Sequence, residues 1–309
     1  MRKSTNCGFD RTVGIWMYQN SGGEVIEQKL INKLKEREID SLTSLDMRFA
    51  HGSNTGITLD GINLSALDLF FSYNAGEQTL SQVYFYEQLN RTVPMINSFE
   101  AFRMTEDKFA TNLILNQNGI KTSDFYLAHR EKPEIIREKL REWGTIVFKP
   151  LDGWGGAGMA KIENEQGLDM LMPFLNQMDI RHFYIERFIK NDYSDFRVDV
   201  VDGEHMFTYG RKASKNDWRT NITAGGSVIL REPNDEIIDI ATRAAKVTGL
   251  DIAGVDMIYD IEKEEYVVLE VNGIPAFATP DQEKMGINFN DKKIDKIVEL
   301  IDKRTKEGK

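Results

Sequence analysis

Residues 145–162 read TIVFKPLDGWGGAGMAKI, in which four glycines fall within the seven residues 152–158. The branched and aromatic side chains on either side predict two strands joined by a glycine-rich loop. P-loops and dinucleotide-binding fingerprints need a helix directly after the glycines, so this context excludes both. A glycine-rich hairpin can instead close over a polyphosphate and donate backbone N–H groups to it. An ordinary turn is the alternative, although four glycines are many for a simple connection.

Two lysines are candidates for holding the same phosphates. Lys149 ends the strand before the loop, where its charge can neutralise phosphate oxygens. Lys108 lies in the first turn of a helix predicted over residues 106–116, with Thr105 as N-cap and Gly119 after its end. The helix dipole disfavours a cation at this position, so the placement of Lys108 favours a role in holding an anion.

Acidic side chains occur in two apolar strands near the end of the chain. Asp256 lies in a strand predicted over 253–259, and Glu270 and Asn272 belong to the next apolar stretch. On adjacent antiparallel strands Asp256 and Glu270 can face each other, and the two-residue period places Glu270 and Asn272 on one face. Two carboxylates and an amide that converge would repel without a hard cation, and Mg²⁺ prefers such oxygens. Exposed strand acids are the alternative, which the apolar neighbours disfavour.

The remaining pattern predicts the α/β class. In the first hundred residues, strands at 12–19, 39–45, 67–73 and 94–97 alternate with helices at 24–37 and 77–90, which predicts a parallel sheet flanked by helices. Later residues predict helices at 133–143 and 235–248, a final helix from Asp291, and a hairpin over 196–212 turned by Asp202 and Gly203. We expect an N-terminal domain over 1–103, a central lobe over 104–184 and a C-terminal lobe over 185–309.

Composition limits the classes of function. The 309 residues carry a formal charge of −10, which disfavours general nucleic-acid or anionic-membrane binding. No apolar run approaches the ~18 residues of a membrane span, and the first residues lack the apolar core of a secretory signal. One cysteine, Cys7, cannot form an internal disulfide, and the expected location is the cytoplasm. A local basic cluster near Arg211, Lys212, Lys215 and Arg219 is interpreted as an ordinary solvated hairpin edge.

Taken in chain order, these motifs resemble the ATP-grasp enzymes. The matching features are Lys108, FKP at 148–150, the loop at 152–158, YIERFI at 184–189, Asp256 and EVN at 270–272. DFR at 195–197, DWRTN at 217–221 and GG at 225–226 resemble the branch that contains the ribosomal-protein glutamate ligase RimK and the amino-group-carrier ligase LysX. The resemblance runs from about Met104 to the end of the chain, and the preceding residues are compatible with the variable N-terminal domain of the family.

The resemblance implies a carboxylate–amine ligase that forms an acyl phosphate and adds glutamate or a similar amino acid to a small molecule, peptide or protein. It implies two lobes that clasp ATP, with ADP and phosphate released. The implied phosphate-binding residues are Lys108, Lys149, Gly153, Trp154, Gly155, Gly156 and Gly158, and adenine would meet the backbone of Glu186, Arg187 and Phe188. Asp256, Glu270 and Asn272 would bind two Mg²⁺ ions, or Mn²⁺. Arg197, Arg211, Arg219 and Asn221 would surround the reacting carboxylate and the transferred phosphoryl group.

Two departures from the family pattern bear on the substrates. Gly273-Ile274-Pro275 stands where relatives usually carry a Pro-Gly pair, so the amine site is expected to differ in shape. Arg187 replaces an acidic or neutral residue and is interpreted as facing solvent. An ATP-dependent phosphotransferase and a nucleotide-binding module without turnover are the alternatives, and the complete set of Lys149, Asp256, Glu270 and Asn272 disfavours the second. Relatives are commonly dimers or tetramers, which makes a homo-oligomer an expectation.

Overall fold

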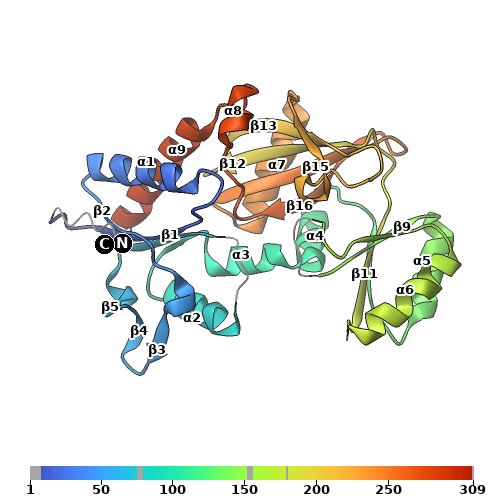
Figure 1. Ribbon diagram of the computed structural model, residues 1–309, viewed down its shortest axis with the longest axis horizontal. Helices are drawn as coiled ribbons and strands as arrows, with labels where there is room; N and C mark the ends of the chain where they lie inside the picture. The colour runs from blue at the N-terminus through green and yellow to red at the C-terminus, as the bar shows by residue number, and fades with distance from the viewer. Residues whose placement is uncertain (1–7, 75–78, 152–155, 179, 308–309) are drawn as a thin grey trace.

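The computed structural model describes residues 8–74, 79–151, 156–178 and 180–307. Three sheet-containing parts follow one another along the long axis of the molecule, and the described chain begins and ends in the same part (Figure 1). The cleft that contains the predicted site residues lies between the second and third parts.

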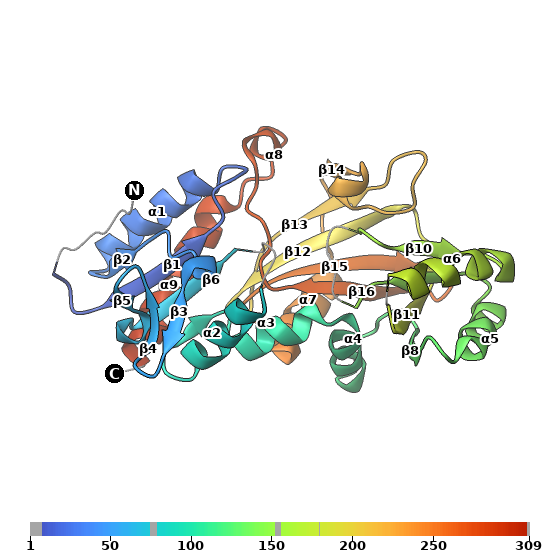
Figure 2. The same cartoon turned by 60° about the horizontal axis from the view of Figure 1, so that its bottom comes forward.

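The first part is the parallel sheet that the alternating pattern predicts. Its strands run in the order β2-β1-β6-β7, all parallel. The elements are β1 (Thr12–Met17), α1 (Gly23–Glu36), β2 (Asp40–Leu42), β6 (Leu69–Tyr73), α2 (Leu80–Asn90) and β7 (Met95–Ile96). The last helix, α9 (Asn290–Glu307), returns to pack beside α1, and its Ile294, Ile297 and Ile301 join the core of this sheet (Figure 2). The final helix therefore connects the C-terminal strands with the N-terminal domain.

A small antiparallel sheet is inserted into this domain and was not predicted. It contains β3 (His51–Ser53), β4 (Gly56–Leu59) and β5 (Ile62–Asn63), with the short helices η1 (Met47–Phe49) and η2 (Leu64–Ala66) at its ends. These strands have two to four residues each, too few to show a two-residue period in the sequence.

The second part is an antiparallel sheet of order β10-β9-β11-β8 covered by two helices. Its elements are β8 (Phe125–His129), α5 (Pro133–Trp143), β9 (Ile146–Lys149), β10 (Ala160–Ile162), α6 (Glu165–Gln177) and β11 (His182–Arg187). Ile136 and Leu140 of α5 and Leu168 and Leu175 of α6 pack on the sheet, so the helices lie on one face of it. The strands before and after the glycine-rich loop pair as predicted, with Phe148 opposite Ala160.

The third part is a five-stranded antiparallel sheet of order β14-β13-β12-β15-β16. Its elements are β12 (Ser194–Val201), β13 (Glu204–Lys212), η3 (Ile222–Ala224), β14 (Ser227–Ile229), α7 (Asp235–Thr248), β15 (Ile252–Asp260), β16 (Glu265–Asn272) and α8 (Pro280–Lys284). Val198, Val255 and Met257 point to the α7 side and are fully buried there. Because strand residues alternate between faces, their neighbours point to the opposite face, toward the cleft.

The helix predicted over residues 106–116 is α4 (Lys108–Gln117), and α3 (Phe99–Glu106), which was not predicted, precedes it with a break at Asp107. The carboxylate of Asp107 caps α4 by accepting a hydrogen bond from the N–H of Ala110 at 2.9 Å. The prediction of Thr105 as N-cap was wrong, because its hydroxyl donates to Ala101 within α3. Gly119 adopts a positive φ of 72° after the end of α4, as predicted. The break leaves Lys108 as the first residue of α4.

Candidate active site

A row of polar side chains crosses four strands of the third sheet. The strand registers place Tyr209 opposite Arg197, Arg197 opposite Asp256, and Asp256 opposite Glu270. Directly opposed residues in antiparallel strands share a face, so all four side chains project from the same face. The sequence prediction that Asp256 and Glu270 face each other is therefore confirmed. Asn272, two residues beyond Glu270, follows on the same face.

Asp256 is held by two arginines. Arg197 Nε lies 2.6 Å from Asp256 Oδ1, and Arg211 Nη2 lies 2.8 Å from Asp256 Oδ2. Arg211 also donates to both oxygens of Asp195, and the Thr220 hydroxyl donates to Asp195 as well. Burial disfavours the charged form of Arg211, but Asp256 and Asp195 outweigh it and raise the pKa of this guanidinium well above its usual value. The pairs keep Arg211 charged inside the protein.

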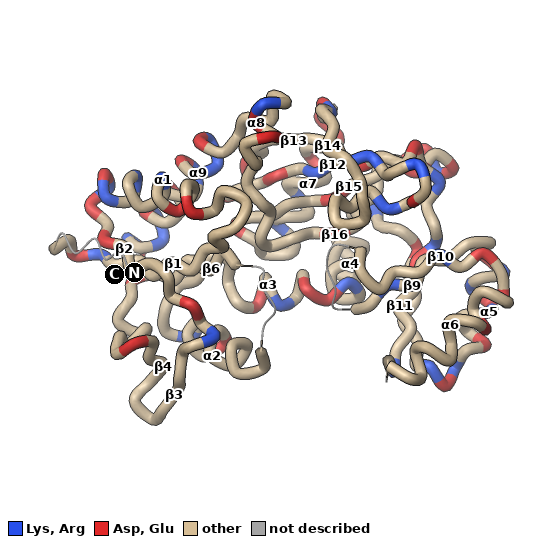
Figure 3. Tube along the Cα trace, viewed as in Figure 1, with Lys and Arg blue, Asp and Glu red and all other residues tan. Residues whose placement is uncertain are grey.

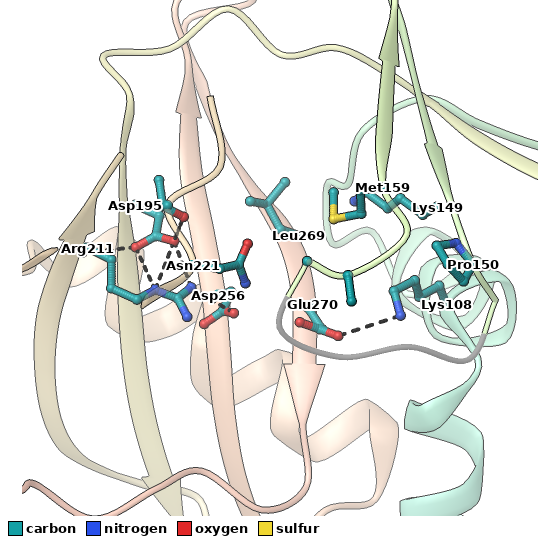
Figure 4. A pocket seen from close by; sticks show the side chains of 13 residues that line it. Lys108, Lys149, Pro150, Met159, Asp195, Arg211, Asn221, Asp256, Leu269 and Glu270 are labelled. Atoms are coloured by element: carbon teal, nitrogen blue, oxygen red, sulfur yellow. Dashed lines mark hydrogen bonds and ion pairs between the residues drawn. The ribbon is translucent and has the colours of Figure 1, made fainter. Parts of the chain in front are cut away.

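The cleft continues from Asp256 toward the second part (Figure 4). Glu270 and Lys108 face each other across it, with Lys108 Nζ 3.9 Å from Glu270 Oε1. The N–H of Lys108 donates to Leu151 O at 3.4 Å, so the start of α4 is bound to the residue just before the glycine-rich loop. The lysine at the helix start therefore lies on the cleft, where an anion could pair with it.

Lys149 is part of a buried polar group. Its Nζ lies 2.6 Å from Glu186 Oε2, and Tyr184 donates to Glu186 Oε1 at 2.9 Å. Asn112 of α4 donates to the Tyr184 oxygen at 2.6 Å. Burial, reinforced by the charge of Glu186, raises the pKa of Tyr184 far above its usual range. Glu186 is thus the counter-ion that fixes Lys149.

The loop predicted to cover phosphate is described only from Gly156 onward. The predicted residues Gly153, Trp154 and Gly155 lie outside the described residues. Arg219 donates to Gly156 O at 2.9 Å while its guanidinium pairs with Asp217 at 2.7 Å. Gly156 has a φ of 76°, and a Cβ there would lie 2.9 Å from Asn221 Oδ1. The end of the glycine-rich loop therefore rests against the segment 217–221.

A second, more apolar pocket adjoins the first. Its walls are Val147, Met159, Phe188, Ile189, Trp218, Ile258 and Leu269 together with Lys149, Glu186, Arg187, Asn191, Arg219, Thr220 and Asn221. Lys149, Met159, Thr220, Asn221 and Leu269 border both pockets, so the two form one continuous cleft. The Phe188 and Trp218 rings meet edge to face at 5.9 Å. An apolar end and a charged end match the base and the phosphates of a nucleotide.

The interpretation of Arg187 as facing solvent was wrong. Its side chain is 11% exposed and pairs with Asp124 at 2.8 Å and with Asp260. Lys263 also pairs with Asp124 at 2.8 Å. Arg187 therefore joins the second and third parts, and it also borders the apolar pocket. Arg211 and Arg219 also pair with acids, and Arg211 is buried, so the interpretation of the basic cluster as a solvated hairpin edge was wrong for Arg211. Acidic and basic residues are interspersed along the trace (Figure 3).

The predicted metal ligands can be tested against their surroundings. Both oxygens of Asp256 are held by the ion pairs with Arg197 and Arg211, and Asn272 donates its Nδ2 to Gly254 O at 3.3 Å, which leaves its Oδ1 available. Glu270 is only partly buried and borders the cleft. Within the described ranges, no cluster of three or more His, Cys, Asp or Glu could hold a metal. Two carboxylates and one amide fit Mg²⁺, which takes its remaining ligands from phosphate and water.

Several side chains of the cleft were not predicted from the sequence. Asp195 is fully buried and orients Arg211, and Thr220 supports Asp195. Asp195 belongs to the DFR motif with Arg197, and this motif was the available signal. Met159, Trp218 and Leu269 form apolar walls. Their sequence neighbours carry no periodicity that assigns them to a pocket rather than a core.

No helix among the described residues combines the length and apolar character that crossing a membrane would take.

The described residues also show which of the predicted site residues lie together. Lys108, Lys149, Gly156, Arg211, Asn221, Asp256 and Glu270 border the charged pocket, and Glu186, Arg187, Phe188 and Arg219 border the apolar one. Arg197 is not among the residues that line either pocket, and it pairs with Asp256 and lies close to Gly254.

Comparisons with known proteins agree with this geometry. Residues 105–297 match the sequence model of the RimK-like ATP-grasp domain. The tetrahydromethanopterin:alpha-L-glutamate ligase of Methanocaldococcus jannaschii is 28% identical over 286 residues, covering 90% of this chain and 96% of its own. A probable alpha-L-glutamate ligase of Alkalilimnicola ehrlichii is 29% identical over 184 residues, which are 59% of this chain and 60% of its own.

Solved structures share the fold at low sequence identity. The ATP-grasp ligase PsnB, in complex with a minimal precursor, Mg and ADP, has a TM-score of 0.66 and 18% identity, and the match covers 95% of this chain and 96% of PsnB. The D-alanine–D-alanine ligase of Bacillus anthracis complexed with ATP also has a TM-score of 0.66 and 18% identity, with 97% and 99% covered. The predicted fold class is confirmed, and so is the predicted enzyme class, an ATP-dependent ligase. The chain belongs to the RimK-like ATP-grasp family.

Proposed function

We propose that this protein uses ATP to convert a carboxylate into an acyl phosphate and couples it to the amine of glutamate or a similar amino acid. The observation that carries the proposal is the polar row Arg197–Asp256–Glu270, in which Asp256 and Glu270 line a cleft together with Lys108 and Lys149, next to an apolar pocket. Two relatives bear the name of alpha-L-glutamate ligases, which supports glutamate as the amine. The acceptor that supplies the carboxylate is a small molecule, a peptide or a protein.

The apolar pocket is the proposed site of the base. Phe188 and Trp218 provide ring surfaces, and the backbone of β11 runs along the pocket. The N–H of Phe188 already donates to Thr145 O at 3.0 Å, so it is not the donor that the base meets. The next N–H along the chain, that of Ile189, has no hydrogen-bond acceptor among the described residues. We assign the contact with the base to Ile189 rather than to Phe188.

The charged pocket is the proposed site of the phosphates and the metal. Lys108 of α4 and Lys149 of β9 lie on one side of this pocket. Asp256, Glu270 and Asn272 belong to the third sheet on the other side. Two Mg²⁺ ions, or Mn²⁺ in their place, would be held by these oxygens and would neutralise phosphate charge when bound. The glycine-rich loop, including Gly153 to Gly158, would cover the phosphates.

The chain's own side chains then act by position and charge. A carboxylate oxygen attacks the γ-phosphorus while ADP leaves, and an amine nitrogen next attacks the acyl carbon while phosphate leaves. Arg197 offers its guanidinium to the carboxylate, and Arg211 keeps Asp256 oriented between Asp195 and the cleft. Arg219 and Asn221 lie under the glycine-rich loop, where a closed loop excludes water from the acyl phosphate. Fixed charges of this kind stabilise the charge that spreads over the transferred phosphoryl group.

The proposal is tested by measuring ADP release with ATP, Mg²⁺, L-glutamate and a panel of small carboxylates and peptides with free carboxyl ends. A ligase releases ADP only when the carboxylate and the amine are both present, and free phosphate appears in equal amount. A phosphotransferase leaves the phosphate on its product, and a binding module releases no ADP with any pair. Either of these last two results would overturn the proposal.

A further inference from the structure

Lys293 of α9 is a fully buried cation outside the cleft. Its side chain is 0% exposed, and its Nζ lies 2.6 Å from Asp199 Oδ2, whose side chain is 2% exposed. The same Nζ donates to Pro275 O at 2.9 Å and lies 4.6 Å from the centre of the Phe277 ring. Burial lowers the pKa of Lys293, and the charge of Asp199 opposes this shift. Neither Lys293 nor Asp199 is among the described residues that line the two pockets of the cleft.

Lys293 holds the segment that follows the metal-ligand candidate Asn272. Pro275 O accepts a second hydrogen bond, at 2.6 Å, from Tyr73 of β6. Farther along, the N–H of Phe277 donates to the Tyr18 oxygen at 3.1 Å, and Asn290 exchanges two hydrogen bonds with the backbone of Ala278. The first domain and α9 thus fix residues 273–278 from outside the cleft.

Asp199 connects the buried lysine with the strand that carries Arg197. The two residues are separated by one position on β12, so their side chains share a face. The partner of Asp199 on β15 is Gly254, where a Cβ would lie 2.6 Å from Pro275 Cβ and closer still to Arg197 Nη1. Arg197 is therefore packed between Asp256, Gly254 and the segment that Lys293 holds. Asp199 Oδ1 accepts no hydrogen bond among the described residues, so Lys293 is its principal partner there.

We propose that Lys293 is a positioning residue of the ligase reaction, which acts through Asp199 and Pro275 O to fix Arg197 and residues 273–278 where the reacting carboxylate binds. The inference rests on the proposed function, because it assigns Arg197 to that carboxylate. Lys293 touches neither the nucleotide pocket nor the reacting atoms. Its loss alters the binding and reaction of the carboxylate and leaves nucleotide binding intact.

A buried ion pair can also have a purely structural role, and a double variant separates the two roles. Removing one partner leaves the other charge buried and uncompensated, whereas neutralising both partners is often nearly neutral for stability. Lys293→Met should therefore lower the melting temperature, and Lys293→Met with Asp199→Asn should recover much of it. A structural role predicts that turnover recovers with stability. A positioning role predicts that turnover does not recover.

The experiment compares the wild-type chain, both single variants and the double variant in thermal melting, Mg·ADP binding, and the kcat and KM of each substrate. We expect the double variant to bind ADP within twofold of wild type and to lose at least tenfold in kcat/KM for the carboxylate. Lys303→Met is the matched control on α9, because Lys303 is 55% exposed and should change none of these values. Wild-type turnover in a stable double variant would overturn the proposal. If Lys293→Met alone prevents folding, the double variant decides by the same criterion, because it leaves neither charge uncompensated.

Failure of the proposed function is recognised separately. If the wild-type chain binds ADP but turns over no substrate pair, amide hydrogen exchange of residues 196–199 and 273–278 replaces kinetics as the readout. The positioning role is supported if amide exchange in these two segments is at least tenfold faster in the double variant than in wild type. Exchange in the ATP-site segments should stay unchanged. Unchanged exchange in both segments overturns it.

Discussion

Arg197 and Asp256 lie directly opposite each other on β12 and β15, and their side chains form an ion pair at 2.6 Å in which Asp256 also contacts Arg211. The pair joins two proposed functions, because Asp256 is proposed as a metal ligand and Arg197 is proposed to bind the carboxylate. Because the two side chains are paired, the position of the acid depends on the arginine and the position of the arginine depends on the acid.

Glu270→Gln should abolish most turnover. The amide keeps the shape of the side chain but removes the charge that a divalent cation needs, so we expect a loss on the order of 10²-fold or more in kcat. Raising Mg²⁺ should recover part of the activity. Steady-state ADP release at several Mg²⁺ concentrations measures both effects. Glu265→Gln on the same strand is the control, and a fully active Glu270→Gln enzyme would contradict the metal assignment.

Gly254→Ala should displace Arg197. The added Cβ would lie 2.6 Å from Pro275 Cβ, so the neighbours must shift, at a cost of about 1–3 kcal/mol in the free energy of unfolding. We expect kcat/KM for the carboxylate to fall and ADP affinity to stay the same. Gly167→Ala is the control, because a Cβ there meets its nearest atom at an ordinary 3.6 Å. Urea denaturation and initial rates are measured for both variants. Wild-type values for Gly254→Ala would show that Arg197 has room to move.

Trp218→Ala should weaken nucleotide binding. The substitution removes one ring of the apolar pocket and its edge-to-face contact with Phe188. The loss of this ring surface should raise the Kd for ADP about tenfold, equivalent to ~1.4 kcal/mol. Calorimetric titration with Mg·ADP measures the change. Phe174→Ala serves as the control because Phe174 is exposed on α6, and an unchanged Kd in Trp218→Ala would place the base elsewhere.

The pair Asp217–Arg219 should make stability depend on pH. The hydrogen bonds from Arg219 lower the pKa of Asp217 to about 2. A depressed carboxyl pKa contributes stability above the unfolded value of about 3.9, and this contribution is lost as the pH falls toward 2. The difference in unfolding free energy between wild type and Asp217→Asn should therefore be larger at pH 6 than at pH 3. Equal differences at the two pH values would show that Arg219 does not stabilise the charged form.

The strands and helices of the cleft could be predicted because their periodicity is strong. The helices at Pro133–Trp143 and Asp235–Thr248 have the predicted bounds, and Asp202 and Gly203 both adopt the positive φ that the predicted turn requires. The pairing of Asp256 with Glu270 followed from two apolar strands in sequence. Local signals were sufficient for these features.

Other features depend on contacts between distant segments. The Glu186 side chain turned out to neutralise Lys149, 37 residues away, and Arg187 pairs with Asp260, 73 residues away. The return of α9 to the first sheet and the burial of Lys293 against Asp199 are also long-range contacts. A hydrophobic period shows which face of an element is buried and leaves open which segment covers it.

The acyl phosphate is the central claim, and transfer of oxygen tests it most directly. A carboxylate substrate labelled with ¹⁸O in its carboxyl group is incubated with ATP, Mg²⁺, L-glutamate and the enzyme, and the released phosphate is analysed by mass spectrometry. Attack of the carboxylate on the γ-phosphorus predicts one ¹⁸O atom in each phosphate released. Phosphate free of ¹⁸O, formed at the same rate as the amide product, would contradict the account.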